Sequence, residues 1–471
     1  MSVGIVWFRQ DLRLADNPAL TRALEENEWV IAVYVHAPEE GQTWSQGSAS
    51  RWWLHHSLSS LDTALRQLGS RLLLLQGDSL TALTSLVQQT GATHLYWNRL
   101  YEPAFVARDT QIKQVLLDRG LGATSFNASL LHEPWAVLRD GATPYRVFTP
   151  YWKAVLAKGP QRSLLPLPKL VPTPQTLPAG VALPALALLP KIPWDQGFRS
   201  VWQVGEDAAH ERLKEFLLAA LKQYREGRDR PDLDGTSRLS PYLHFGELSP
   251  AQIIHEIQLA QQHLNLMTPA AESYVRELVW REFAYSLLYH FPKTQDECLD
   301  QRFQQFPWRT DYRDDLGAWQ CGHTGFPLVD AGMRQLWQTG WMHNRVRMVV
   351  ASFLIKNLLI PWQEGARWFW DTLVDADLAN NTLGWQWVAG CGADAAPYFR
   401  IFNPVLQGQK FDPQGEYVRR WVPELEGVPA RFIHQPWLAP VSSLSATYPK
   451  PLVELSASRK NALDAFSRIS H

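Results

Sequence analysis

Residues 3–8 read Val-Gly-Ile-Val-Trp-Phe, a short apolar run rich in strand-forming residues. Three more runs of this type follow, and helical patterns separate them: the runs are 30–35, 72–76 and 93–97, and the helical patterns are 49–68, 79–89 and 103–119. Strands that alternate with helices predict βαβ units and a parallel sheet. We therefore expect residues 1–130 to form a Rossmann-like α/β domain. The first run is not followed by Gly-x-Gly-x-x-Gly, which disfavours an ordinary NAD site.

The composition changes after this region. Nine prolines fall between Pro160 and Pro193, so this stretch can be neither a helix nor a central strand. We expect residues 131–200 to be an interdomain connector whose Leu and Val side chains pack on the surface. From 201 to 471, apolar spacings of three and four predict an all-α domain. The helices predicted there are 207–225, 249–263, 270–289, 327–339, 343–358 and 364–373.

Composition limits the partners, the metal sites and the cellular compartment that we expect for the protein. The 471 residues carry a formal net charge of −1, so a nucleic-acid partner requires a local basic surface. The three cysteines form no Cys-x-x-Cys pair, which argues against a disulfide framework and against a zinc site. The N-terminus has no signal-peptide pattern, and the apolar runs are too short to span a membrane. We expect a monomeric, cytoplasmic protein without a metal.

The C-terminal half contains the segments that point to chemistry. Residues 375–387, DADLANNTLGWQW, hold two carboxylates, two asparagines and two tryptophans within thirteen positions, a mixture that a purely structural segment rarely needs. Residues 235–240 combine small residues, hydroxyls and Arg238 before a helical region, which suits a diphosphate, although a helix-capping turn has the same pattern. Glu277 and Arg281 are four residues apart, which equally fits an exposed ion pair.

These segments together resemble the photolyase and cryptochrome family over nearly the whole chain. The matching pieces are 6–14 (VWFRQDLRL), 235–240, 277–283, 324–330 (TGFPLVD), 340–347 and 375–404. The resemblance implies an α/β N-terminal domain, a connector and a helical FAD-binding domain. It implies light-dependent repair of cyclobutane pyrimidine dimers in DNA, by electron transfer from excited reduced FAD to a dimer swung out of the helix.

The resemblance assigns residues to FAD. The diphosphate side is assigned to Tyr224, Thr236, Ser237, Arg238, Leu239 and Ser240. Arg281 adds charge there, and Asn344 reaches the flavin. Arg347 is expected to pair with Asp375 beside the isoalloxazine, with Asp377 near the ribose and ring edge. Asn381 is expected to face N5, where a neutral amide favours the fully reduced anion; a carboxylate would favour a neutral radical, as in many plant cryptochromes.

The resemblance also assigns electron transfer and DNA contacts. Trp385, Trp362 and Trp308 match an electron-transfer chain that runs from flavin to surface, although three ordinary tryptophans would be the simpler reading without the motifs. The lesion pocket is assigned to Glu277, Trp280, Asn344, Met348 and Trp387, and further DNA contacts to Arg228, Arg345 and Gln407. His343 is followed by Asn344 and not by a second histidine, which indicates cyclobutane dimers as the lesion.

The second chromophore and the competing functions stay open. Residues 51–54 and 100–103 resemble plant cryptochromes and related bacterial photolyases, and Pro103-Ala104-Phe105 departs from the usual folate contact set. Methenyltetrahydrofolate is our first expectation for an antenna, and a deazaflavin is the second. A cryptochrome-type light sensor is the alternative function, although Asn381 and the short C-terminal region argue for repair. A flavin oxidoreductase that does not use light is a third reading, but we identify no acid–base residue for it.

Overall fold

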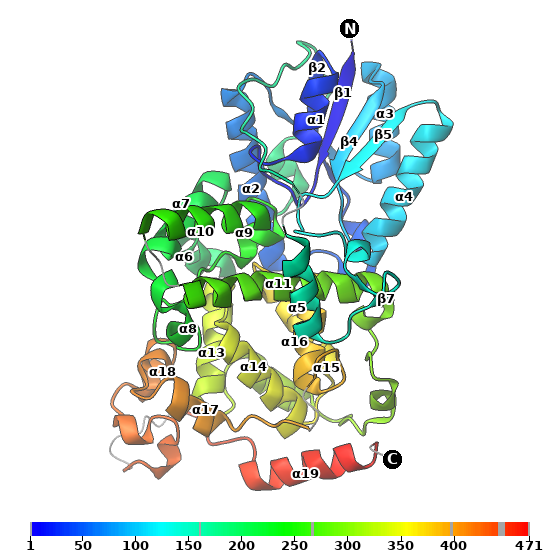
Figure 1. Cartoon of the computed structure of the whole chain (residues 1–471). Coiled ribbons are helices and arrows are strands. Elements are labelled where there is room, and N and C mark those ends of the chain that lie inside the picture. Colours follow the sequence, from blue (N-terminus) through cyan, green and yellow to red (C-terminus); the bar gives the residue numbers. More distant parts are fainter. Residues whose placement is uncertain (1, 160–161, 265–267, 396–398, 441–447, 470–471) are drawn as a thin grey trace.

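The fold was analysed in a computed structural model, which describes residues 2–159, 162–264, 268–395, 399–440 and 448–469. Five parallel strands form one sheet in the order β3-β2-β1-β4-β5. Their bounds are β1 Val3–Phe8, β2 Trp29–His36, β3 Leu72–Gln76, β4 His94–Asn98 and β5 Gly122–Phe126. The sheet and its helices occupy one end of the molecule, and helices fill the rest (Figure 1). The predicted fold class is confirmed.

Helices cover both faces of the sheet because alternate residues of each strand point to opposite sides. Val6 and Phe8 of β1 pack with helices α1 (Pro18–Glu26) and α2 (Ser48–Gln67). Ile5 and Trp7 pack instead with α3 (Ser79–Thr90) and α4 (Pro103–Asp118). Strands buried on both faces are apolar at nearly every position, which is why residues 3–8 are recognisable in the sequence.

The segment between the sheet and the helical region contains a helix, α5 (Phe148–Lys158), and a small hairpin of β6 (Leu138–Arg139) and β7 (Thr143–Pro144). The described part of the Pro-rich stretch runs along the sheet. The Val30 N–H donates to Pro172 O over 2.7 Å, and the Val181 N–H donates to Leu74 O over 2.9 Å. A proline cannot donate a backbone hydrogen bond but can accept one, so the stretch follows the strands without joining the sheet.

The remainder is helical. Its longer helices are α7 (Glu206–Ala219), α10 (Pro250–Leu264), α11 (Thr268–His290), α13 (Pro327–Thr339), α14 (Asn344–Ser352), α15 (Trp362–Thr372), α16 (Leu378–Ala389) and α19 (Leu455–Ser467). Shorter helices lie between them: α6 (Phe198–Val201), α8 (Tyr224–Gly227), α9 (Ser240–His244), α12 (Arg313–Gln320), α17 (Pro404–Phe411) and α18 (Glu416–Trp421). Within the described ranges, no helix is both long and apolar enough to cross a membrane.

Two predicted helices differ from the structure. The pattern over 207–225 predicts one helix, but α7 ends at Ala219 and the chain turns through Leu221–Gln223 before α8. The pattern over 343–358 predicts a continuous helix, but α14 passes at Ser352 into a π-helical turn, Phe353–Asn357. The wider turn buries five consecutive side chains, including Lys356 and Asn357, so the apolar spacing alone could not reveal it.

The segment after β1 joins the sheet to the helical region. Arg13 is fully buried, and its guanidinium donates to Gly246 O and Ala128 O, each over 2.8 Å. The Glu206 carboxylate accepts hydrogen bonds from the Leu14 and Ala15 N–H groups. This part of the 6–14 motif is therefore structural, since it holds the two regions in one orientation.

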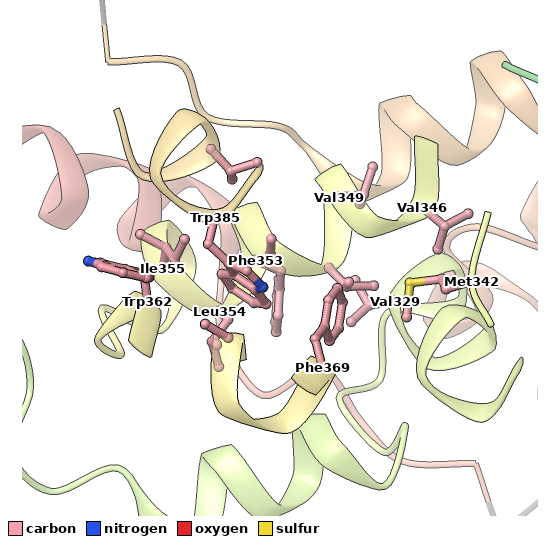
Figure 2. Packing of buried hydrophobic residues seen from close by; sticks show 14 of the residues in the cluster. Val329, Met342, Val346, Val349, Phe353, Leu354, Ile355, Trp362, Phe369 and Trp385 are labelled. Carbon is pink, nitrogen blue, oxygen red and sulfur yellow. The ribbon is translucent and has the colours of Figure 1, made fainter. Parts of the chain in front are cut away.

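The largest core lies among α13, α14, α15 and α16. Figure 2 shows part of it, with Trp362, Phe369 and Trp385 beside apolar residues of the α14 region. The Trp385 ring packs edge-on against Phe369, with ring centroids 5.0 Å apart. This core supports the floor of the cavity described next.

Candidate functional site

A cavity with two adjoining lobes opens between α11, α14 and α16. The larger lobe has a volume of about 560 Å³ and the smaller about 270 Å³. Pockets of this scale, roughly 300–1,000 Å³, hold cofactors and other small molecules. The residues that line both lobes are Arg228, Glu277, Arg281, Asn344, Arg347, Asp375, Asp377 and Asn380. All but Asn380 are site residues predicted from the sequence.

Arg347 and Asp375 form the ion pair expected of them. The Arg347 Nη2 atom lies 2.8 and 3.1 Å from the two carboxylate oxygens of Asp375. The Ser240 hydroxyl donates to the same carboxylate over 2.6 Å. Asp375 is buried, and the guanidinium and hydroxyl together compensate the loss of its hydration. The pair therefore sets a fixed charge pattern at the junction of the two lobes.

Asp377 lies in a dense hydrogen-bond network. It caps α16 through the Asn380 N–H, and its carboxylate also accepts from Asn380 Nδ2 over 2.7 Å. The Tyr285 hydroxyl donates over 2.5 Å, and His244 Nδ1 lies 3.3 Å away. Burial by itself would raise the pKa of Asp377, but hydrogen bonding to His244 and Tyr285 and the charge of Arg281 hold it well below its ordinary value. Asp377 is thus an ionised group deep in the site.

Glu277 forms its ion pair with a residue outside its own helix, α11. Its carboxylate accepts a hydrogen bond of 2.5 Å from Arg228 Nη1. Arg281, which the spacing could have paired with Glu277, instead donates to the backbone oxygens of Ser129 and Leu243. The structure therefore rejects the ion pair along α11 and leaves Glu277 and Arg228 together in the cavity wall.

Two tryptophans and a methionine give the larger lobe its apolar walls. The Trp280 ring stacks on Phe148 with centroids 3.7 Å apart and an interplanar angle of 6°. Trp387 is held by a hydrogen bond of 3.0 Å from its Nε1 to Asp394 O. Met348 lines the same lobe. Rings anchored from behind in this way offer flat apolar surface to a ligand.

The start of α14 orients Asn344, Arg345 and Arg347. His343 caps the helix by accepting a hydrogen bond from the Arg345 N–H over 3.2 Å. Burial lowers the pKa of His343 to about 4, so its ring is neutral and can accept. Arg345 pairs with Asp229 over 2.8 Å, beside the cavity that it also lines.

The smaller lobe contains the predicted diphosphate residues. Its lining includes Tyr224, Thr236, Ser237, Arg238, Leu239 and Ser240. Arg212 holds this loop by donating to Thr236 O and Ser237 O. Arg238 has a left-handed backbone, with φ of 53°, and its Nε atom lies 3.4 Å from a carboxylate oxygen of the exposed Asp234. Because α9 has only five residues, side chains and backbone N–H groups must bind an anion here with little help from a helix dipole.

Asn381 lines the larger lobe, and a hydrogen bond fixes the orientation of its side-chain amide. Its Nδ2 atom donates to Ala366 O over 3.0 Å, which leaves the side-chain oxygen as the acceptor available to a ligand. Trp385 lines the same lobe, whereas Trp362, Trp308 and Gln407 are absent from the lining formed by the described residues. Trp362 is buried, and the ring of the partly buried Trp308 lies 4.4 Å from that of Phe306.

Several site residues were not found from the sequence. His244, Tyr285, Asn380, Trp341 and Tyr274 line the cavity or bind its carboxylates. His244 and Tyr285 are 133 and 92 residues from Asp377, so no local spacing connects them. Asn380 could have been found, since an asparagine three residues after an N-capping aspartate is well placed to bond it.

Comparisons with known proteins identify the family of the chain. The family model for DNA photolyase matches residues 4–175, and the model for the FAD binding domain of DNA photolyase matches residues 274–468. A deoxyribodipyrimidine photo-lyase of Agrobacterium fabrum is 47% identical, covering 99% of this chain and 98% of its own.

Two solved structures are also similar over their full length. A bacterial class III photolyase from Agrobacterium tumefaciens is 46% identical with a TM-score of 0.95, covering 100% of this chain and 98% of its own. A cryptochrome of Synechocystis sp. PCC6803 is 30% identical with a TM-score of 0.90, covering 99% of each chain. The chain therefore belongs to the DNA photolyase family, which has cryptochromes among its members.

Proposed function

We propose that this protein uses light to split cyclobutane pyrimidine dimers in DNA, with FAD in the two-lobed cavity. The observation that carries the proposal is the junction of the lobes. A polar lobe suited to a diphosphate opens at Glu277, Arg228 and Asn344 into a larger lobe walled by Trp280 and Trp387. A cofactor and a planar substrate can thus occupy one continuous space.

The residues present fit FAD. Arg238 and the rest of the loop 236–240 would hold the diphosphate, with Arg281 adding charge from α11. The Arg347–Asp375 pair and Asp377 would hold the flavin and ribose edge together with Asn344, and Tyr224 would lie on the diphosphate side. Bound reduced FAD supplies the light-excited electron that opens the dimer and takes it back, so no net redox change results.

Asn381 supports the reduced anion. Because its amide nitrogen is bound to Ala366 O, its oxygen remains to accept the N5–H of a reduced flavin. The residue brings no negative charge to the ring, in contrast to the aspartate expected in many plant cryptochromes. This orientation favours repair over sensing.

The larger lobe suits a dimer that has left the helix. Trp280 and Trp387 would stack on the pyrimidines, with Met348 filling the wall between them and the flavin. Glu277 and Asn344 would bond the base edges. A damaged pair stacks and pairs poorly, so its extrusion costs less than that of an intact pair. Arg228, Arg345 and Gln407 would bind the surrounding DNA backbone.

Trp385, Trp362 and Trp308 would reduce oxidised FAD in light. Trp385 and Trp362 lie in the same buried cluster (Figure 2). Trp385 also lines the cavity, and Trp308 packs against the cluster. Trp385 thus lies at the cavity wall, Trp362 in the core and Trp308 at a partly exposed position. This order suits the movement of an electron hole from the flavin towards the surface.

A cryptochrome-type light sensor is the second candidate, because a cryptochrome matches the chain over 99% of its length. One experiment separates the two. Purified protein is mixed with an oligonucleotide that carries a single thymine dimer, and repair is measured in blue light and in darkness. Repair in light alone supports the photolyase; binding with no repair in either condition supports the sensor and refutes our proposal.

An antenna would sit in the cavity at the carboxyl ends of β1, β2 and β4. Its lining includes Leu54, Leu100, Glu102 and Phe105, from the segments that suggested an antenna, together with Arg9 and Arg108. The free space is only about 70 Å³, so a bound chromophore must displace side chains. Methenyltetrahydrofolate remains our first choice and a deazaflavin the second; the absorption spectrum of the chromophore extracted from the purified protein tests both.

We also propose a monomeric, cytoplasmic protein with domains at 1–130 and 201–471 joined by a connector at 131–200. Its three cysteines are free thiols, as expected in a reducing compartment. Gel filtration with light scattering tests the monomer, and limited proteolysis tests the boundaries.

A further inference from the structure

Trp362 has a thiol as its hydrogen-bond partner. Its indole N–H donates to Cys298 Sγ, with the two atoms 3.3 Å apart. Both side chains are buried, with 1% of Trp362 and 6% of Cys298 exposed. A buried cysteine is usually a small apolar filler. Here its sulfur contacts the nitrogen of the tryptophan that stands in the middle of the proposed electron-transfer chain.

A second thiol, Cys391, completes the cluster. Gln386 ties the two together: its side-chain oxygen accepts from the Leu299 N–H over 2.9 Å and lies 4.0 Å from Cys391 Sγ. The Asp300 N–H donates to Cys391 O over 2.9 Å. The two residues that follow Cys298 are therefore fixed against Gln386 and Cys391.

Both thiols belong to the same buried cluster. Hydrogen bonding to Cys391 lowers the pKa of the Cys298 thiol, whereas burial raises the pKa of the Cys391 thiol well above its ordinary value. Cys298 is thus the readier of the two to lose its proton, and Cys391 is the partner that can trap its sulfur. Both are free thiols in this structure.

We propose that Cys298 and Cys391 form an internal two-electron donor that feeds the photoreduction of FAD through Trp362 and Trp385. The proposal rests on the proposed function, because it assumes that light drives electrons along these tryptophans to oxidised FAD. Cys298 returns an electron to oxidised Trp362 and loses its proton. Cys391 then supplies the second electron as a disulfide forms between the two sulfurs.

The step balances. Two S–H bonds break and one S–S bond forms, which releases two electrons and two protons. Conversion of FAD to FADH⁻ consumes two electrons and one proton, and the second proton goes to solvent. Photoexcited oxidised FAD is the oxidant, and each disulfide formed corresponds to one reduced flavin.

The test is to count thiols after illumination. Purified protein with oxidised FAD is illuminated without oxygen or added reductant, quenched in acid, denatured and alkylated with a maleimide. Mass spectrometry then counts the modified cysteines, and Cys321 serves as an internal standard because it is exposed. We expect three alkylated thiols in the dark and only Cys321 after full flavin reduction. Reduction of the flavin with all three thiols intact would overturn the proposal.

Serine variants separate redox chemistry from packing. Cys298→Ser keeps an acceptor for Trp362 Nε1 but cannot form a disulfide. Cys391→Ser removes the second thiol that the disulfide needs. Each should abolish donor-free photoreduction, and Cys321→Ser should behave as the parent protein. Photoreduction of both variants at the parent rate without added donor contradicts the inference.

Failure of this proposal differs from failure of the proposed function. Both variants, reduced with dithionite and given the dimer oligonucleotide, should repair it at the parent rate, since neither thiol lines the cavity described above. Parent protein that starts with oxidised FAD, gains dimer repair in light without added reductant and keeps all three thiols refutes the thiol donor alone. Dithionite-reduced parent protein that cannot repair dimers refutes the proposed function, whatever the thiols do.

Discussion

Replacing Gly365 by alanine should displace the indole that lines the cavity. Gly365 lies inside α15, and a Cβ atom there would stand 2.0, 2.5 and 2.7 Å from the Cη2, Cζ3 and Cζ2 atoms of Trp385. Carbon atoms in contact normally lie roughly 3.5–4.0 Å apart, so the ring or the helix must move by about 1.5 Å. Trp385 cannot yield easily, because it is wedged against Phe369 and Trp319.

Two opposing effects determine how Gly365→Ala changes the free energy of unfolding. Alanine in place of glycine inside a helix gains up to about 1 kcal/mol. Overpacking of a filled core costs about 1–3 kcal/mol, and the clash here involves three ring atoms. We expect overpacking to win, with a net loss of about 1–2 kcal/mol in the free energy of unfolding. We also expect slower flavin photoreduction, because the displaced ring is the first of the proposed chain.

Urea unfolding followed by circular dichroism measures the first effect, and flavin absorbance under blue light measures the second. Gly317→Ala is the matched control, because Gly317 is also helical, in α12, and apart from its chain neighbours and its own helix backbone no described heavy atom lies within 4 Å of the added Cβ. The control should be as stable as the parent or slightly more so. Gly365→Ala protein with the parent's unfolding midpoint and photoreduction rate would refute the reasoning.

Three further changes test the site. Asn381→Asp removes the donor to Ala366 O and brings charge to the flavin, so less reduced anion should accumulate in light; an unchanged flavin spectrum and repair rate would count against the assignment. Arg347→Met leaves the buried Asp375 without its cation and should lower the free energy of unfolding by about 3 kcal/mol. Adding Asp375→Asn should restore part of that loss, as measured by thermal unfolding. Burial raises the pKa of Glu102 from 4.5 to about 8. The stabilisation that its proton gives to the folded state is therefore full below about pH 4.5 and is lost as the pH rises to about 8. Glu102→Gln should flatten that part of the profile of melting temperature against pH, and an unaltered slope would contradict this prediction.

Local sequence was sufficient for most of the α/β region. Strands β1 and β3 and helix α3 lie within a residue of their predicted bounds, because buried parallel strands and capped helices have strong local patterns. β5 was not predicted, since Gly122-Ala-Thr-Ser-Phe126 has little apolar or branched content. The sheet order also needed the structure, because β1 pairs with β2 and β4 through contacts far apart in sequence.

The site, like the sheet, was predicted from the sequence only in part. The identities of Glu277, Arg347, Asp375 and Asn381 were predicted from motifs that the chain shares with its family. Which charges pair was decided by tertiary structure. Spacing along α11 allowed Glu277 to bind Arg281, but the approach of α8 brought Arg228 to it instead.

The sequence by itself determined the alternation of strands and helices before residue 130, the helical character of residues 201–471 and the chemical groups available to the site. These depend on residues a few positions apart, where backbone preference and apolar spacing act. Only the tertiary structure decided that Tyr285 and His244 bind Asp377, and that Cys298 bonds Trp362 beside Cys391. Side-chain hydrogen bonds act over a few ångströms in space, and packing of the whole core selects which distant residues come that close.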